Sequence, residues 1–288
     1  MTALSVVVAN VLDQVSEVES ALDALERELA DGDQIVLVDA AGTAPQRPGV
    51  TYVRASPPPS RGGLYAAGLA ASTHDLVAFS DSSTEPQPGW RRAAVAALVA
   101  GAGVVGGPVM PGHDRTLRTV AGFLVEYGPH AVAPFTNASG DVAANNVAYH
   151  RAVLDPVLGP GEPLWKNVVN GRLRARGSPP VLVPAMRVTS TKTYGWRDIV
   201  TGRAAHGRLY GAQRSASWTR ARRVTAALAC AGLPLVGHLR LVARTSGEQR
   251  LRTDLVRATP LVVLALLMWS VGEALGYLLG PGSAGDVF

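Results

Sequence analysis

The stretch Asp75-Leu-Val-Ala-Phe-Ser-Asp81-Ser-Ser-Thr-Glu85-Pro-Gln-Pro-Gly-Trp90 decides how this chain folds. Its first part, Leu76 to Phe79, is a short continuous apolar run, which predicts a strand buried on both faces. The run passes directly into an acidic, hydroxyl-rich turn and then into Pro-Gly-Trp. Ligands of open α/β sheets bind beyond the carboxyl ends of the strands, so Asp81 is a candidate ligand-binding residue.

The residues before this stretch predict further strands of the same sheet. Ser5 to Ala9 and Gln34 to Asp39 are apolar runs, and the leucine spacing over residues 15–29 predicts a helix between them. Strand, helix and strand of this texture predict an α/β fold with a mostly parallel sheet flanked by helices. Asn10, Asp39 and Asp81 then stand at the carboxyl ends of their strands.

Composition excludes several classes of protein. The 288 residues are 47% hydrophobic and 17% charged, which excludes a disordered chain. Cys230 is the only cysteine, so an intrachain disulfide and a multi-cysteine zinc site are excluded, and we expect a reducing, cytoplasmic compartment. The net charge of +5 comes from arginines in the second half, where few aromatic residues are interleaved. This pattern favours an anionic membrane surface as partner over nucleic acid.

The C-terminal region predicts hydrophobic helices. Residues 224–242 are apolar but broken by Gly232-Leu-Pro234, which predicts a bent interfacial helix or a hairpin. Residues 258–280 are long enough to cross a bilayer, and whether they span it or lie in its interface stays open. Glu273 within them must lie near an interface, be protonated or pair with another group. Arginines precede this segment, so we expect the protein on the cytoplasmic face of the cell membrane.

Seven elements, by their order and spacing, resemble a bacterial family 2 glycosyltransferase of the GT-A fold with a C-terminal membrane-associated segment. They are Ser5-Val-Val-Val-Ala-Asn10, Val36-Leu-Val-Asp39, Leu76-Val-Ala-Phe-Ser-Asp81, Pro86-Gln-Pro-Gly-Trp90, Asn145-Asn-Val-Ala-Tyr-His-Arg151, Leu173-Arg-Ala-Arg-Gly177 and Gly272-Glu-Ala-Leu-Gly-Tyr277. The resemblance implies a GT-A domain over 1–196, basic membrane-proximal helices over 197–257 and a membrane helix over 258–280. It also implies inverting transfer of a sugar from a nucleotide sugar to a cell-envelope, polysaccharide or natural-product acceptor, which is a saccharide, a lipid-linked molecule or a small molecule.

The resemblance implies a donor site at the strand ends. Asn10, Asp39, Arg61 and Asp81 would bind the nucleotide sugar, and Asp81 would also hold a divalent metal, Mg²⁺ or Mn²⁺, because these ions prefer hard oxygen ligands. Each residue has a plainer structural interpretation. Asp81 is also an ordinary helix or turn cap, Asp39 a solvated strand end and Arg61 an exposed loop residue.

The rest of the site departs from the pattern of such relatives. Asn145 and Asn146 would bind the acceptor or fix a turn. Lys166 stands where relatives carry an acidic base, so Glu162 is the candidate base, unless it only favours a helix N-terminus, and Lys166 would steady the diphosphate. Ser82 and Ser83 stand where further metal ligands are expected, and Ser190 where a histidine is common. A catalytically silent GT-A protein that binds a nucleotide, a lipid or a partner enzyme therefore stays open as the alternative.

Overall fold

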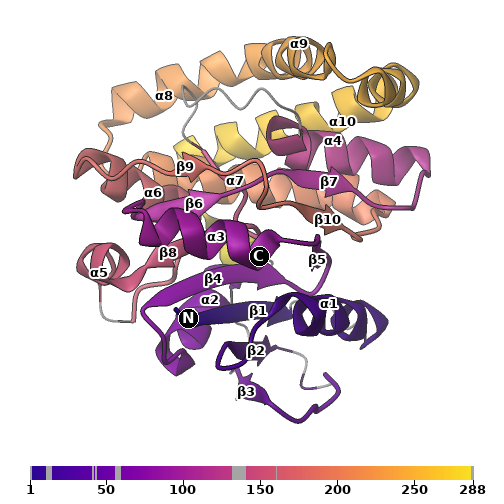
Figure 1. The fold of residues 1–288 in the computed structure, drawn as a ribbon. Helices are drawn as coiled ribbons and strands as arrows, with labels where there is room; N and C mark the ends of the chain where they lie inside the picture. Colours follow the sequence, from indigo (N-terminus) through magenta and orange to yellow (C-terminus); the bar gives the residue numbers. More distant parts are fainter. Residues whose placement is uncertain are drawn as a thin grey trace. The chain divides into compact units, whose positions relative to one another are not determined.

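The computed structural model describes residues 2–10, 15–40, 42, 44–55, 60–131, 141–159 and 161–286, drawn in Figure 1. The chain divides into two compact units. Unit 1 comprises residues 1–110 and 133–191, and unit 2 comprises residues 111–132 and 192–288. The expected boundary at residue 196 differs from this division, because residues 111–132 group with the C-terminal helices.

A seven-stranded sheet forms the centre of unit 1, with the strand order β3-β2-β1-β4-β8-β6-β9. Strands β3, β2, β1 and β4 run parallel, whereas β8 runs antiparallel to its neighbours β4 and β6. The α/β fold predicted from the sequence is confirmed. The strands are β1 (Leu4–Asn10), β2 (Gln34–Asp39), β3 (Val50–Arg54), β4 (Leu76–Asp81), β6 (Val104–Gly106), β8 (Val147–His150) and β9 (Val181–Leu182).

The register of the parallel strands brings their polar ends together. Asn10 pairs with Asp39 across β1 and β2, and Ala9 pairs with Asp81 across β1 and β4. Every residue of β1 and β4 is buried, so hydrophobic burial on both faces holds the strands in this register. The polar residues that end the strands therefore lie side by side at one edge of the sheet.

Helices flank the sheet, and α2 packs closely against it. A Cβ at Gly68 would lie 2.2 Å from Val7 and 2.9 Å from Val38, so only glycine permits this approach. The ring of Tyr65 meets Phe79 of β4 edge to face at 5.2 Å between centroids. The helices of unit 1 are α1 (Val15–Glu28), α2 (Arg61–Ala71), α3 (Trp90–Val99), α5 (Arg151–Leu154) and α6 (Lys166–Ala175).

A three-stranded sheet in the order β5-β10-β7 carries the turn after β4. Its strands are β5 (Thr84–Pro86), β10 (Val188–Ser190) and β7 (Val109–Pro111). Ser190 pairs with Thr84 in the antiparallel register of β10 and β5, and Thr191 N donates to Ser83 O at 2.8 Å. This pairing places Ser190 beside the acidic turn.

Unit 2 is helical, and its other long helices pack against α10 (Gln249–Leu279). These helices are α4 (Leu117–Ala131), α7 (Arg203–Arg214), α8 (Arg220–Ala229) and α9 (Leu233–Thr245). A 3₁₀ turn at Cys230–Gly232 separates α8 from α9, which confirms the predicted break. By length and composition alone, residues 220–245 and 249–279 are two helical stretches that could cross a membrane.

The contact between α7 and α10 is a backbone-to-backbone contact made through glycines. A Cβ at Gly207 would lie 2.3 Å from Trp269 O, and one at Gly272 would lie 1.9 Å from Ala204 O. Gly211 and Gly276 repeat the arrangement one turn further along. Each helix thus presents a pair of glycines four residues apart to the other, which allows the two backbones to touch.

Glu273 is buried in this contact and is fully engaged. Its Oε1 accepts from Tyr277 Oη at 2.6 Å, and its Oε2 accepts from Trp269 Nε1 at 2.8 Å. Arg214 Nη1 lies 4.0 Å from Oε1. Of the three possibilities set out for this carboxylate, the structure shows pairing with other groups.

Candidate functional site

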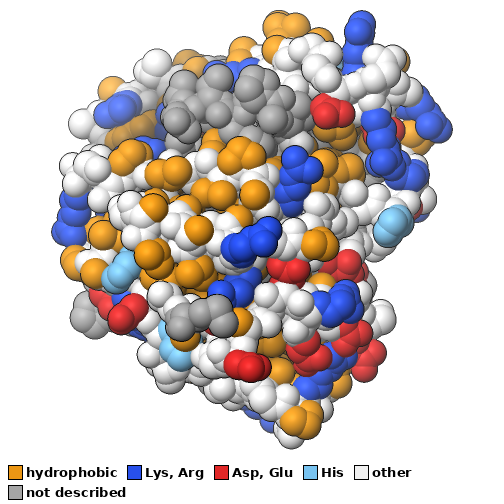
Figure 2. All heavy atoms as spheres, in the orientation of Figure 1, with side chains coloured by type: hydrophobic (Ala, Val, Ile, Leu, Met, Phe, Trp, Pro, Cys, Tyr) orange, Lys and Arg blue, Asp and Glu red, His pale blue; other side chains and the backbone are white. Residues whose placement is uncertain are grey.

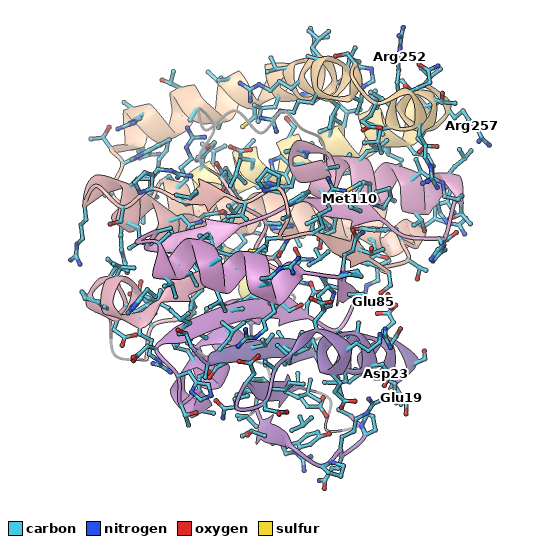
Figure 3. All side chains as sticks on the ribbon, viewed as in Figure 1. Glu19, Asp23, Glu85, Met110, Arg252 and Arg257 are labelled. Carbon is cyan, nitrogen blue, oxygen red and sulfur yellow. The ribbon has the colours of Figure 1, made fainter. Side chains whose placement is uncertain are left out.

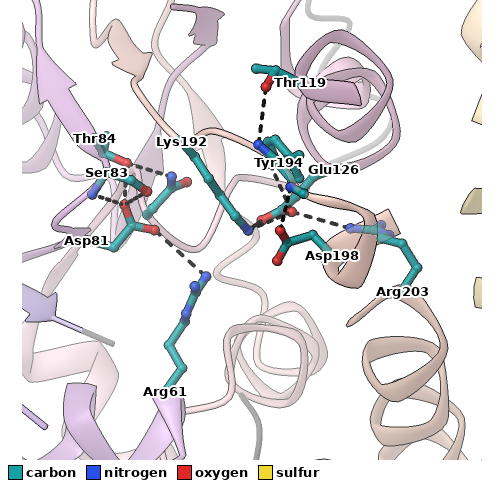
Figure 4. Close-up of polar contacts among 12 residues, drawn as sticks. Arg61, Asp81, Ser83, Thr84, Thr119, Glu126, Lys192, Tyr194, Asp198 and Arg203 are labelled. Carbon is teal, nitrogen blue, oxygen red and sulfur yellow. Dashed lines mark hydrogen bonds and ion pairs between the residues drawn. The ribbon is translucent and has the colours of Figure 1, made fainter. Parts of the chain in front are cut away.

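Asp81, at the end of β4, has two carboxylate oxygens in different environments (Figure 4). Its Oδ1 accepts from Ser83 N at 3.2 Å, Ser83 Oγ at 3.0 Å and Thr84 Oγ1 at 2.6 Å. Its Oδ2 is buried and has no hydrogen-bond partner among the described residues. The turn therefore fixes the carboxylate through one oxygen and leaves the other as a buried, unused acceptor.

Arg61 supplies the positive charge nearest to that second oxygen. Its Nη1 lies 3.7 Å from Asp81 Oδ2, an ion pair rather than a hydrogen bond. Arg61 is the first residue of α2, and Ser60 caps the helix by accepting from Gly63 N at 3.1 Å. Burial raises the pKa of the Tyr65 hydroxyl, and the charge of Asp81 adds to the rise. A helix N-terminus and a guanidinium thus face one carboxylate, a setting that favours an incoming anion.

Asn10 and Asp39 form the neighbouring part of the strand-end site. Asn10 Nδ2 donates to Asp39 Oδ1 at 3.0 Å, and Ala44 N donates to Asp39 Oδ2 at 2.8 Å. Asn10 Oδ1 is buried without a hydrogen-bond partner in the described chain. The structure brings the predicted pair into contact and holds the Asp39 carboxylate in one orientation.

The two adjacent asparagines have different environments. Asn145 Nδ2 donates to Thr84 Oγ1 at 2.7 Å, and Thr84 in turn donates to Asp81, so Asn145 belongs to the acidic turn. Asn146 is fully buried: it accepts from Trp90 Nε1 at 2.8 Å and donates to Pro108 O and Met186 O. The side chain of Asn146 thus fastens three segments together, and its role in binding the acceptor stays a prediction.

Glu162, the candidate base, is engaged in an ion pair. Both of its oxygens accept from Arg172 at 2.7 Å, and Oε2 also accepts from Gly159 N at 3.0 Å. The hydrogen bonds from Arg172 and Gly159 hold the pKa of Glu162 below its usual value. Both oxygens of Glu162 are thus occupied by hydrogen bonds of a structural ion pair, and its role as base stays a prediction.

Lys166 is paired with a carboxylate that the sequence did not single out. Its Nζ lies 2.9 Å from Asp141 Oδ1, and Arg174 lies 4.0 Å from the same oxygen. Asp141 is half-buried and follows residues 132–140, which lie outside the described residues. Lys166 begins α6, and the carboxylate beside it comes from a different segment of the chain.

A second polar cluster, in unit 2, was also missed. Glu126 of α4 accepts from Lys192 at 3.2 Å, Tyr194 at 3.0 Å and Arg203 at 3.3 Å, as Figure 4 shows. Lys192 also lies over the Tyr194 ring, and Arg203 over Trp269. These contacts tie α4 to the segment before α7. Sequence spacing offers no signal for them, because the partners are more than 60 residues apart.

A divalent metal at this site would have one protein ligand among the described residues, an oxygen of Asp81. The described residues contain no group of three or more His, Cys, Asp or Glu side chains able to hold a metal ion. Asp81 Oδ2 is nevertheless a buried carboxylate oxygen without a donor, which is the kind of ligand that Mg²⁺ and Mn²⁺ prefer. The site fits an ion whose remaining ligands come from a bound diphosphate and water.

Comparisons with known proteins place the fold. No family model matches the chain, and no curated protein matches it. Among solved structures, it is similar to a mannosyltransferase from Pyrobaculum calidifontis in complex with GDP-Man and Mn²⁺, with 16% identity and a TM-score of 0.56 over 94% of this chain and 86% of that one.

Two further solved structures are similar over about three quarters of the chain. A mycobacterial protein has 19% identity and a TM-score of 0.49, covering 73% of this chain and 74% of that one. Glucosyl-3-phosphoglycerate synthase from Mycobacterium tuberculosis has 18% identity and a TM-score of 0.48, covering 75% and 79%. The chain thus has a GT-A-like α/β fold, similar in structure to that mannosyltransferase.

Proposed function

We propose that this protein is an inverting glycosyltransferase that moves a sugar from a nucleotide sugar to an acceptor hydroxyl. One observation carries the proposal. Among the described residues, Asp81 Oδ2 is a buried acceptor without a donor, it stands at the edge of a GT-A-like sheet where ligands bind, and Arg61 lies 3.7 Å from it. A buried polar atom left unsatisfied costs about 1–3 kcal/mol, so its retention favours a ligand-binding role.

The donor would lie along the ends of β1, β2 and β4. Asn10 and Asp39 would receive the nucleoside, because they stand at neighbouring strand ends and Asn10 Oδ1 is a buried acceptor without a hydrogen-bond partner in the described chain. Arg61 would meet the diphosphate, since its guanidinium is held at the N-terminus of α2, beside but not bonded to Asp81. As the sugar leaves, negative charge accumulates on the diphosphate, and this fixed cation would stabilise it.

Asp81 would be the protein ligand of a divalent metal. Its Oδ1 is held by three donors, which would keep Oδ2 pointed at the ion without reorganisation. A metal bound there would act as a Lewis acid on the departing diphosphate. The structurally similar mannosyltransferase is described in complex with GDP-Man and Mn²⁺, which supports this assignment.

Asp141 is the carboxylate we propose for deprotonation of the acceptor. It lies four residues before Asn145, whose amide joins the Thr84 and Asp81 turn. Lys166 faces it at 2.9 Å and would hold its carboxylate in place, and Asp141 would accept the proton as the hydroxyl attacks the anomeric carbon. Asn145 would help orient the acceptor. Lys166 would then act on Asp141 rather than on the diphosphate.

We further propose that the protein works at the cytoplasmic face of the cell membrane on a cell-envelope, polysaccharide or natural-product acceptor. The apolar helices of unit 2 and their arginines support this location. No part of the strand-end site distinguishes among saccharide, lipid-linked and small-molecule acceptors. The donor is therefore the part of the function to test first.

The test is calorimetric titration of the detergent-solubilised protein with UDP, GDP and dTDP, with and without Mn²⁺. We expect one nucleotide to bind, more tightly with metal, and Asp81→Ala to lose the metal effect. Binding that is indifferent to metal and to Asp81 would remove this residue from the mechanism. Asp141→Asn should bind the nucleotide normally and lose sugar transfer, whereas unchanged transfer would remove Asp141 as the base.

A catalytically silent GT-A protein is the second candidate, and a specific observation favours it. The described residues hold no cluster of three metal-ligating side chains, and Ser190, where relatives present a histidine, has a buried hydroxyl without a hydrogen-bond partner in that part of the chain. Such a protein would bind a nucleotide, a lipid or a partner enzyme without transfer. Hydrolysis of the matching nucleotide sugar by the purified protein would eliminate this candidate.

A further inference from the structure

The helical stretch formed by α8 and α9 has an unusual combination of composition and exposure. Residues 220–245 are apolar enough for a membrane helix, yet α8 buries none of its residues and α9 buries only Leu241 and Thr245. Leu228 is 74% exposed, Leu235 66% and Leu239 56%. An apolar helix left open along its length marks a surface that binds something.

Arginines stand at both ends of this apolar face. Arg220, Arg222 and Arg223 precede Val224, and Arg240 and Arg244 follow Leu239. Arg252 and Arg257 of the neighbouring helix α10 also extend into solvent, as Figure 3 shows. Figure 2 shows hydrophobic side chains with Lys and Arg among them where Figure 1 draws α8 and α9. This is the charge pattern that complements an anionic lipid surface.

The two ends of the face are both attached to polar parts of unit 2. At the start of α8, Arg222 lies 4.1 Å from the Trp218 ring centroid, and Arg223 donates to Ala216 O. At the end of α9, Arg244 donates to Pro129 O of α4 at 2.9 Å. The apolar run between Arg223 and Arg240 covers residues 224–239, fewer than the roughly 20 needed for a helical span. The stretch therefore has both ends on one side of a bilayer.

Helix α10, the stronger candidate span, has protein on two sides, while Leu267 and Val271 stay exposed. One side touches α7 backbone to backbone at Gly272 and Gly276, and α7 carries Arg203, Arg208 and Arg214. The α8–α9 stretch runs along α10 as well, since Ser270 donates to Cys230 O and Gly237 lies against Leu266. If α10 crossed the bilayer, α7 and its arginines would enter the hydrocarbon beside it, which is costly for charged side chains.

We propose that unit 2 docks on one leaflet of an anionic membrane through the exposed face of α8 and α9, and that α10 supports this face from inside the protein without crossing the bilayer. Leu228, Leu235 and Leu239 enter the interface, and the flanking arginines contact lipid phosphates. The proposal deepens the membrane location proposed above and rests on it. It does not depend on sugar transfer.

Flotation of the full-length protein with lipid vesicles tests the docking face. We expect binding to vesicles of phosphatidylcholine and phosphatidylglycerol, little binding to phosphatidylcholine alone, and weaker binding in high salt. Leu228→Glu with Leu235→Glu should lower the bound fraction by roughly tenfold or more, because two exposed leucines no longer enter the interface. Arg220→Glu with Arg240→Glu should remove the preference for phosphatidylglycerol. Val99→Glu, at a 63% exposed apolar position of α3, is the matched control and should bind as the parent does.

A second measurement distinguishes docking from spanning. In a Cys230→Ala background, Ser283→Cys lies beyond α10 and Ser16→Cys lies on α1, and both positions are exposed. In inside-out membrane vesicles, docking predicts that an impermeant maleimide labels both cysteines without detergent. Labelling of Ser16→Cys alone would show that α10 spans and would overturn the proposal. A protein that fails to float, and whose oligomer dissociates in the double leucine variant, would show that a second copy covers the face.

Nucleotide binding separates this proposal from the proposed function. The docking variants should bind the nucleotide as the parent does, because none of their residues belongs to the strand-end site. Loss of flotation with intact nucleotide binding supports the docking face. A parent protein that floats but binds no nucleotide would contradict the glycosyltransferase proposal and leave the docking face supported.

Discussion

Two buried carboxylates, Asp81 in unit 1 and Glu273 in unit 2, are held in different ways. Glu273 has a hydrogen bond to each oxygen, from Tyr277 and from Trp269. Asp81 has three donors on one oxygen and, among the described residues, none on the other. Both side chains are almost completely buried, so exposure alone does not separate them.

The difference teaches that satisfaction of hydrogen bonds, more than burial, separates a structural carboxylate from a functional one. Glu273 has the contacts that a buried charge needs for stability, and its removal should damage the fold. Asp81 keeps a buried acceptor unused, which costs stability and is useful only when a ligand arrives. The following substitutions test this distinction.

The largest expected effect is that of Asp81→Asn on activity. The amide can keep the three hydrogen bonds at Oδ1 and loses the negative charge at the second oxygen. We expect sugar transfer to fall by about 100- to 1,000-fold, as for removal of a group that stabilises transition-state charge, with an almost unchanged thermal unfolding midpoint. Initial rates with the cognate nucleotide sugar and a thermal melt measure the two quantities.

Glu273→Gln is the matched control for that substitution. The amide oxygen can keep the hydrogen bond from Trp269 Nε1, but the amide nitrogen then faces Tyr277 Oη, whose hydrogen bond must reverse direction and lose its charged acceptor. Stability should therefore fall by about 1–3 kcal/mol, while nucleotide affinity of the folded protein stays the same. The comparison between the two carboxylates fails if the control loses activity without losing stability.

Arg61→Ala should have the next largest effect, on diphosphate binding. A charged hydrogen bond is worth about 1.5–3 kcal/mol, so affinity for the nucleoside diphosphate should fall by about tenfold to 100-fold. Arg61→Lys should recover part of it, since the charge remains. Affinity for the nucleoside monophosphate is the control and should change little. Equal losses for both ligands would show that Arg61 acts on the fold of α2 and not on the diphosphate.

Asp33 is a structural carboxylate of unit 1, and its hydrogen bonds make the stability of the protein depend on pH. Burial raises its pKa, but hydrogen bonds from Arg91, Ala30 and Leu4 outweigh burial and leave the pKa below its ordinary value of 3.8. A carboxylate with a lowered folded-state pKa stabilises the protein above its unfolded pKa, and this stabilisation is lost as the pH falls through the folded pKa.

Asp33→Asn should therefore destabilise the protein by about 1–3 kcal/mol at pH 7, and the difference from the parent should shrink below pH 3.8. Denaturant unfolding as a function of pH measures both. A difference that stays constant down to the lowest pH would mean that the lost packing, and not the charge, explains the destabilisation.

Glu162→Gln should have the smallest effect. Its ion pair with Arg172 is partly exposed, and such pairs contribute about 0–1 kcal/mol. We expect turnover within about twofold of the parent and a small drop in stability. A loss of turnover comparable to that of Asp141→Asn would restore Glu162 as the base.

Much of unit 1 could be predicted from the sequence, because its strands are continuous apolar runs with polar residues at their ends. Gln34–Asp39 has the predicted bounds, and Asn10 and Asp39 are in contact as strand-end neighbours. The side-chain partners could not be predicted. Lys166 with Asp141 and Glu162 with Arg172 depend on how loops return to α6, which no local pattern records.

The role of Asn146 and the grouping of α4 were beyond the sequence for a related reason. Asn146 is buried because the Trp90 indole needs an acceptor, and those residues are 56 positions apart. The place of helix α4 with α9 and α10 follows from tertiary contacts such as that of Gly128 with Leu241. Tertiary contacts of this kind have no counterpart in composition or periodicity, so the sequence alone does not predict them.

Gly68 fixes the position of α2 on the sheet, and with it the position of Arg61 in the donor site. Gly68 packs directly against Val7 and Val38. Arg61 lies seven residues earlier, about two helical turns, so Arg61 and Gly68 lie on the same side of the helix. Inserting one residue between them would keep the helix and the packing of Gly68 but turn the guanidinium by about 100° around the axis. The direction in which Arg61 points therefore depends on the number of residues between it and Gly68. An insertion would keep the positive charge but turn it away from Asp81, whereas Arg61→Ala removes the charge.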